Sequence, residues 1–336
     1  MPHLASPQQT VFPAAPRPLN IYASHAPRSG KLASSSLALG AALLSIWSGT
    51  AQAADAPSGN DEPKIASYSL DIEAKVLTDR RNRGISDTFN NPGAQMTITA
   101  AHESGFIGLL EVGTVSKDVF PEGDRLLVLG ATGYRWGKHD GWHFGLGIAR
   151  EWFPGAKAID APTGFDWTTF TPTGTVTTNF NTTYGVFEFG YKLLEMRYLY
   201  VMSQDLRGNN TAVLCGSAYL PQLLAGGDPS KAMACYDQGF KHSGGSHLLD
   251  MDIKYPIAPQ TKLTAHLGFQ KLHNFRDGDL LDYKFGVIRT KWGFDFGAEV
   301  VGAKLRNRDL AIVTDSHGKS KRLDSTALLL SVGKRF

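Results

Sequence analysis

Beyond Ala53 the sequence lacks any long hydrophobic run, because charged residues interrupt every window of the roughly 20 residues that a membrane-spanning helix needs. If the protein lies in a membrane, it must cross as β-strands. An excess of one charge is also missing, since the formal net charge is +3 and no basic cluster with interleaved aromatics occurs. Nucleic acid is therefore not expected as a partner.

Export is indicated at the N-terminus. Residues 1–30 are rich in Pro, Ala and Ser and lack periodicity, as in a disordered extension. Arg28 and Lys31 precede an apolar run at residues 32–47, and residues 51–53 read Ala-Gln-Ala, a small-residue cleavage site. This order is typical of a secretory signal peptide of the Sec pathway, with cleavage expected near 53/54.

Cysteine is scarce, since the chain has only Cys215 and Cys235. Export would place both in an oxidising compartment, which favours a disulfide over two free thiols. Closing a loop of this length stabilises a fold by roughly 3 kcal/mol in the chain-entropy model. The cysteine spacing fits no zinc site, and CxxC and HExxH are absent, so we expect no metal and no cofactor.

The C-terminal residues 325–336 alternate apolar side chains with small or polar ones and stop on Phe336. Because a strand has a side-chain period of two, one face is apolar and the other is polar. An outer-membrane barrel ends in this way, since its last strand pairs with its first and leaves no edge. The alternative is a buried C-terminal strand of a soluble sandwich.

Twelve segments show this alternation, each with about the 9–11 residues that a tilted strand needs to cross a bilayer. They predict an all-β protein, a single antiparallel transmembrane β-barrel of about 12 strands. The segments are residues 67–77, 94–103, 106–115, 124–136, 142–152, 182–191, 193–203, 245–255, 261–271, 281–290, 292–303 and 325–336.

The connections between these segments alternate between tight turns and longer loops, the longest at residues 153–181 and 204–244. Outer-membrane barrels show this pattern, with short turns on the periplasmic side and long loops on the extracellular side. Aromatic side chains gather on the outward face at the expected periplasmic ends, as in an interfacial girdle. These are Tyr68, Tyr134, Trp136, Trp142, Tyr191, Tyr255, Trp292 and Phe336.

The inward face is highly charged, and a dry core is excluded because unpaired buried charges cost several kcal/mol each. The interior must hold water, pair its charges, or both. Two interpretations stay open: a narrow aqueous channel with a mixed-charge lining, and a closed barrel filled by salt bridges. The candidate pore-lining residues are Asp71, Glu73, Lys75, Glu111, Arg135, Glu151, Glu188, Glu195, Arg197, Asp250, Asp252, Lys254, Lys262, His266, Asp282, Lys284, Asp295 and Glu299.

Evidence for catalysis is weak. Ser246 and His247 are a candidate Ser–His pair of a membrane hydrolase. However, consecutive residues of a strand point to opposite faces, and no G-x-S-x-G motif occurs. His102, His143 and His266 lie on three separate segments and form no metal-ligand pattern by spacing. We therefore expect no catalytic residue and no enzyme activity.

The residues Arg83-Gly84-Ile85-Ser86, which follow the first predicted strand, resemble the R-G-[IV]-S signature of the TorF-like family of porins. Shorter pieces at residues 103–106, 245–247 and 265–268 are similar as well, whereas the length of the 204–244 loop departs from the family pattern. The resemblance implies a porin-like outer-membrane protein and brings no known solute. From the residues alone, the Arg-Gly pair either pins the first loop into the lumen or forms a barrel-closing turn.

The sequence as a whole predicts a disordered extension plus signal peptide at residues 1–53, a periplasmic lead-in at 54–66 and a barrel at 67–336. The main hypothesis is an outer-membrane channel of a Gram-negative bacterium that passes small hydrophilic solutes by diffusion. The alternative is a closed structural or surface-interaction barrel that acts through its extracellular loops. Expected partners are outer-membrane lipid, lipopolysaccharide, and the barrel-assembly machinery that reads the strand ending at Phe336.

Overall fold

The computed structural model describes residues 68–137, 141–224 and 226–336. The predicted N-terminal extension, the signal peptide with its cleavage site and the periplasmic lead-in lie outside the described residues. Every helix within the described ranges is too short or too polar to cross a membrane.

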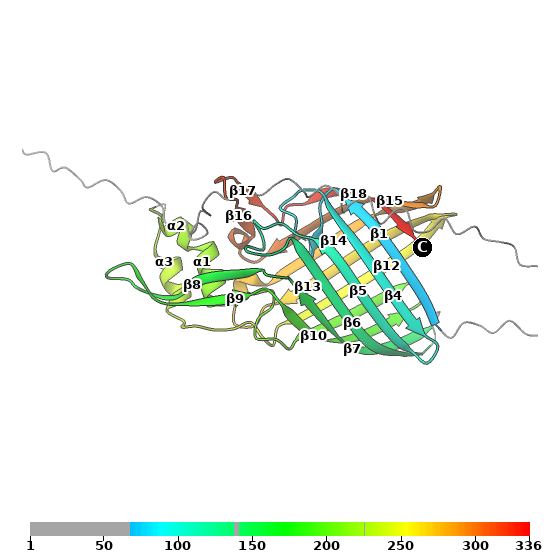
Figure 1. The fold of residues 1–336 in the computed structure, drawn as a ribbon, viewed down its shortest axis with the longest axis horizontal. Coiled ribbons are helices and arrows are strands. Elements are labelled where there is room, and N and C mark those ends of the chain that lie inside the picture. The colour runs from blue at the N-terminus through cyan, green and yellow to red at the C-terminus, as the bar shows by residue number, and fades with distance from the viewer. Residues whose placement is uncertain (1–67, 138–140, 225) are drawn as a thin grey trace, which may run out of the picture. The chain divides into compact units, whose positions relative to one another are not determined.

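Twelve antiparallel strands close into a barrel in the order β1-β18-β15-β14-β13-β12-β11-β10-β7-β6-β5-β4 (Figure 1). Each predicted segment corresponds to one barrel strand, so the predicted fold and its strand number are confirmed. The barrel strands are β1 (Tyr68–Leu77), β4 (Gly93–His102), β5 (Phe106–Thr114), β6 (Leu126–Gly137), β7 (Trp142–Trp152), β10 (Thr182–Tyr191), β11 (Leu194–Val201), β12 (His247–Ala258), β13 (Thr261–Lys271), β14 (Leu280–Lys291), β15 (Phe294–Leu305) and β18 (Ala327–Arg335).

Closure depends on β1, which pairs with β4 on one side and with β18 on the other. Ile72 lies opposite Ile98 of β4, and Val76 lies opposite Val332 of β18. The C-terminal strand therefore joins the first strand, as its sequence predicts. Because the barrel is closed, it has no edge strand whose unpaired backbone N–H and C=O groups could pair with another chain.

Large apolar side chains cover the outside of the barrel. Leu146, Phe285 and Leu328 are 56, 58 and 62% exposed, whereas Leu329, the next residue along β18, is 7% exposed because it points inward. Soluble proteins rarely expose an apolar surface that runs around the whole molecule. The outer face is that of a transmembrane β-barrel, whose strands alternate lipid-facing apolar and lumen-facing polar residues.

The barrel has two different ends. Tight turns join β4 to β5, β6 to β7, β10 to β11, β12 to β13 and β14 to β15, and this end is called the short-turn end. Outward aromatic rings gather there, with Trp142 and Tyr191 stacked at 4.2 Å between ring centroids. The opposite, long-loop end carries the remaining elements (Figure 1). These are β2 (Arg81–Asn82), β3 (Ile85–Ser86), β8 (Lys157–Asp166), β9 (Thr171–Asn179), α1 (Thr211–Ala218), α2 (Leu220–Leu224), α3 (Ser230–Tyr236), η1 (Arg276–Gly278), η2 (Arg308–Ala311), β16 (Ile312–Thr314) and β17 (Ser320–Arg322).

A small disulfide-bonded module lies within the loop between β11 and β12. The Asn210 side chain caps α1 by accepting from the Val213 amide, as N-cap residues do. Cys215 of α1 and Cys235 of α3 form a disulfide with a Cα–Cα distance of 5.8 Å. The predicted disulfide is thus confirmed, and it cross-links two helices whose buried residues Ala218, Ala232 and Tyr236 form an apolar cluster with it.

Candidate functional site

The loop after β1 folds into a short hairpin, which is called the inserted hairpin and comprises residues 78–93. Its strands β2 and β3 are joined by Arg83 and Gly84, with φ angles of 49° and 72°. Two consecutive positive φ values are those of a type I′ turn, which suits a two-residue hairpin. Glycine adopts this conformation freely, but arginine does so rarely, so contacts of the Arg83 side chain must hold it.

The side chains of the inserted hairpin reach strands on several sides of the barrel. Arg83 Nη1 donates to Asp250 Oδ1 of β12 at 2.7 Å, and its Nε lies 3.7 Å from Asp282 Oδ2 of β14. Asn82 Nδ2 donates to Glu151 Oε1 of β7 at 3.0 Å. These three strands are spread around the barrel order, so a hairpin that contacts all of them lies inside the barrel.

The backbone of the inserted hairpin lies directly against the wall. A Cβ atom at Gly84 would be 2.3 Å from the Gly302 carbonyl oxygen of β15, closer than real Cβ atoms come. Glycine is therefore required here both by the turn and by the close approach. Of the two alternatives for Arg83-Gly84, insertion into the lumen is the one that matches these contacts, and a simple barrel-closing turn does not.

A polar network inside the hairpin pairs the charges that it brings into the barrel. Asp79 accepts from Arg81 Nε at 2.7 Å and from the Ser86 hydroxyl at 2.6 Å. Arg80 donates to Asp87 at 2.6 Å and to Glu111 of β5 at 2.8 Å. Buried ions are tolerated when partners satisfy them in this way, and removing one partner costs about 3–5 kcal/mol.

Arg207, from the loop between β11 and β12, connects the inserted hairpin to the wall. Its Nη2 lies 2.9 Å from Asp87 Oδ2, and its Nε lies 3.4 Å from Glu151 Oε2. The guanidinium also stacks on Phe120 and Phe153, 5.2 and 5.0 Å from the ring centroids. Burial works against the charged form, but Asp87 and Glu151 outweigh burial and raise the Arg207 pKa. The guanidinium therefore remains charged and holds both elements together.

Next to the inserted hairpin, a row of ion pairs crosses the four neighbouring strands β11, β12, β13 and β14. Arg197 Nη2 lies 2.9 Å from Asp252 Oδ2. His266 contacts Asp252 through Nδ1 and Asp282 through Nε2, both at 2.9 Å, and Asp282 in turn faces Arg83. Carboxylates only accept, so both ring nitrogens donate and His266 is an imidazolium.

Solvent access changes along the lumen. At the long-loop end, the side chains of Arg80, Asp87 and Asp282 are 6, 2 and 2% exposed. Toward the short-turn end, the inward side chains of Arg197 and Arg335 are 49 and 53% exposed. The inserted hairpin thus fills the long-loop half of the barrel, while in the other half Arg197 and Arg335 are about half exposed and their partners Asp252 and Asp295 are 21 and 17% exposed.

The remaining candidate pore-lining residues are mostly paired with one another. The pairs toward the short-turn end are Glu73–Lys75 at 3.2 Å, Lys284–Glu299 at 3.9 Å, Asp295–Arg335 at 3.5 Å, and Arg135–Glu188. Among the described residues, Asp71, Lys254 and Lys262 are the candidates with no ion pair. The sequence analysis singled out Arg83 only as part of the R-G-I-S motif. Arg80 and Arg207 were absent from the sequence-based set, because their position inside the barrel leaves no trace in strand periodicity.

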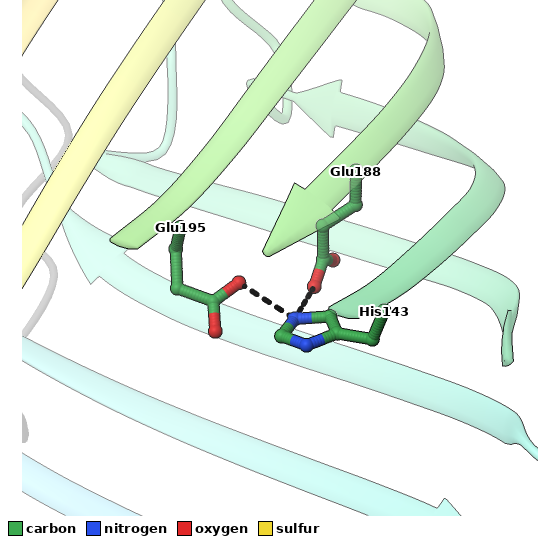
Figure 2. A group of neighbouring side chains, drawn as sticks. All are labelled: His143, Glu188 and Glu195. Atoms are coloured by element: carbon green, nitrogen blue, oxygen red, sulfur yellow. Dashed lines mark hydrogen bonds and ion pairs between the residues drawn. The ribbon is translucent and has the colours of Figure 1, made fainter. Parts of the chain in front are cut away.

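A separate group lies close to the short-turn end. His143 of β7, Glu188 of β10 and Glu195 of β11 point toward one another (Figure 2). His143 Nε2 is 3.1 Å from Glu195 Oε2 and 3.9 Å from Glu188 Oε1, and the ring is 1% exposed. Both glutamates were predicted to face inward. His143 shares the parity of the inward positions of its strand, which is the signal by which the sequence identifies it.

The side chains of Ser246 and His247 form hydrogen bonds with other residues and not with each other. The Ser246 hydroxyl donates to the Ser243 carbonyl and accepts from the His273 amide. His247 instead contacts the Tyr198 hydroxyl on the outer face. The arrangement is the one expected from the opposite faces of consecutive strand residues.

The comparisons with known proteins concern most of the described barrel. Residues 62–336 match the family described as "Bacterial protein of unknown function (Gcw_chp)". The chain belongs to this family. The resemblance to TorF-like porins is a separate, finer assignment and stays a prediction. Among curated proteins, none matches this chain.

Several solved outer-membrane barrels share the fold at low similarity. The KdgM porin is 8% identical with a TM-score of 0.40, covering 79% of this chain and 98% of its own. The NanC porin is 11% identical with a TM-score of 0.41, also covering 79% and 98%. The COG4313 outer membrane channel from Pseudomonas putida F1 is 10% identical with a TM-score of 0.35, covering 84% and 100%. At these values the likeness carries no statement about solute or activity.

Proposed function

We propose that this protein is an outer-membrane channel through which small hydrophilic solutes diffuse, and that the inserted hairpin sets its narrowest part. The observation that carries the proposal is the gradient of exposure inside the barrel. Charged inward side chains such as Arg197 and Arg335 remain about half exposed, which requires water around them. A wet interior that narrows toward one end is the form of a constricted pore.

The apolar outer belt supports the membrane location, and the loop arrangement supports the orientation. Bacterial barrels have short periplasmic turns and long external loops, so the short-turn end is assigned to the periplasm and the inserted hairpin to the external half. Solutes would enter past the Arg80–Asp87–Arg207 network and leave through the wider, charged half. Because cations and anions alternate along this path, the solute class favoured is small and neutral or zwitterionic rather than strongly charged.

Single-channel recording in a planar bilayer tests the proposal. The purified, heat-modifiable protein should give discrete conductance steps. Arg83→Ala, which removes the contacts with Asp250 and Asp282, should release the hairpin and enlarge the step. The matched control is Arg306→Ala, because Arg306 is an exposed loop arginine. Folded protein that gives no steps in either form would refute the channel.

A second candidate function has one observation in its favour. The long-loop half is closely filled, since Arg207 pairs with Asp87 and packs against the stacked rings of Phe120 and Phe153. A barrel closed at this level would act through its structured loops, namely the β8–β9 hairpin and the disulfide-bonded helices. The Arg83→Ala recording distinguishes the two functions: steps only in the variant indicate a closed native barrel, and steps in both indicate a channel.

A further inference from the structure

His143 and Glu195 lie in one row of the sheet, and Glu188 lies two residues along β10 from that row. His143 and Glu195 both lie directly opposite Gly190, one on each neighbouring strand. A Cβ atom at Gly190 would be 2.1 Å from His143 Nε2 and 2.9 Å from Glu195 Oε2. The imidazole therefore extends over the bare glycine and reaches the carboxylate two strands away, as Figure 2 shows for the residues that it labels.

The geometry directs one nitrogen at two carboxylates. One oxygen of each glutamate and Nε2 of His143 lie within 4.8 Å of one another. A proton on Nε2 can be donated in a hydrogen bond to Glu195 at 3.1 Å. Glu188, at 3.9 Å, is beyond hydrogen-bond range. A metal ion bonds nitrogen and oxygen ligands at about 2.0–2.2 Å, so a shared ion would bond all three atoms once the side chains close in on it.

The other lumenal histidine gives an instructive contrast. His266 also contacts two carboxylates, but Asp252 is bound through Nδ1 and Asp282 through Nε2. The two nitrogens of one imidazole point in different directions and cannot coordinate the same ion. His266 is thus a protonated bridge, whereas His143 presents one donor atom to a shared point.

Charge and access also fit a cation at this point. Arg135 contacts Oε1 of Glu188, the same oxygen that faces His143, so a bound ion would have to share this oxygen with the guanidinium. The two carboxylates and one guanidinium leave a net charge of about −1 when the His143 ring is neutral. The Glu195 side chain is 37% exposed, which leaves room for water ligands from the lumen. Three protein ligands with water in the fourth position form a known donor set for zinc.

We infer that His143, Glu188 and Glu195 bind a divalent transition-metal ion, with zinc as the representative of the class. One imidazole nitrogen and two carboxylate oxygens suit zinc better than magnesium, which prefers oxygen ligands and keeps most of its water. This inference is independent of the proposed channel function, because metal binding to the folded barrel can be measured whether or not the barrel conducts.

The test is calorimetric titration of Zn²⁺ into tag-free, EDTA-treated mature protein whose folding is checked by heat modifiability. One saturable site is expected. His143→Ala and the isosteric Glu195→Gln should weaken the affinity by about tenfold or more, since even outer-shell changes cost that much. Gly190→Ala should do the same, because its Cβ displaces the imidazole.

His266→Gln is the matched control and should leave the zinc affinity unchanged, and Mg²⁺ should not compete. Equal zinc binding in the native protein, His143→Ala and Glu195→Gln would overturn the inference, as would an equal loss in His266→Gln. Glu195→Gln keeps the size of the side chain, so the result stands even if a variant at the buried His143 does not fold.

Discussion

Gly84→Ala should detach the inserted hairpin from the barrel wall without unfolding the barrel. The new Cβ would lie 2.3, 2.5 and 2.8 Å from three backbone atoms of Gly302 and Ala303, which are fixed in β15 and cannot yield. The positive φ adds about 1–2 kcal/mol. If the hairpin shifts, Arg83 leaves Asp250 and Asp282, and breaking a buried pair costs about 3–5 kcal/mol.

Gly318→Ala provides the control, since Gly318 has a φ of +80° but nothing within 4 Å of its Cβ position. Hydrogen exchange of residues 78–93 measures the free energy of local opening. Each 1.4 kcal/mol or so of lost local stability speeds hydrogen exchange about tenfold, so Gly84→Ala should accelerate exchange in this segment by roughly hundredfold or more. Gly318→Ala should leave exchange in that segment unchanged and affect only its own turn. Unchanged exchange in Gly84→Ala would refute the close packing of the hairpin on β15.

Three further predictions concern other parts of the molecule. Leu146→Lys should destabilise the folded barrel by about 2–4 kcal/mol in urea unfolding, because a charge then faces lipid, whereas Thr97→Lys on the inward face should be tolerated; equal effects would reverse the face assignment. Cys215→Ser should expose the loop between β11 and β12 to protease, with a loss of about 3 kcal/mol confined to that module, while heat modifiability of the barrel persists. Burial, then the hydrogen bond to Asp277, raises the pKa of Tyr219 to about 12. The folded state holds this proton more tightly than the unfolded state, so the stabilisation is complete below the usual tyrosine pKa of about 10 and is lost as the pH rises toward 12. In ultraviolet titration, Asp277→Asn should bring this phenol down toward ordinary values, and no change would exclude the contact.

The strands, their faces and the disulfide could be predicted because each depends on local sequence. Alternation in a segment such as residues 261–271 reports the environment of every second side chain, and in a barrel that environment is lipid on one face and the lumen on the other. Likewise, two cysteines in an exported chain have only each other as partners. These predictions required no knowledge of which strands are neighbours.

The contents of the lumen could not be predicted in the same way. Arg83 and Asp250 are 167 residues apart in the sequence, and strand periodicity says nothing about which loop turns inward. The R-G-I-S residues indicated a special turn, yet a turn at the rim and a turn inside the barrel have the same local sequence. His143 was recognised as lying on a strand of its own, but its approach to Glu195 depends on the cross-strand register with Gly190, which spacing along the chain does not reveal.

The position of the inserted hairpin has a consequence for the order of events during biogenesis. The hairpin is synthesised directly after the first strand, whereas its anchors on β12, β14 and β15 are synthesised much later. The charged side chains of the hairpin must therefore stay hydrated until the barrel strands surround them, since they cannot be placed against lipid. Docking of the hairpin onto β12, β14 and β15 therefore has to follow the assembly of these strands into the sheet.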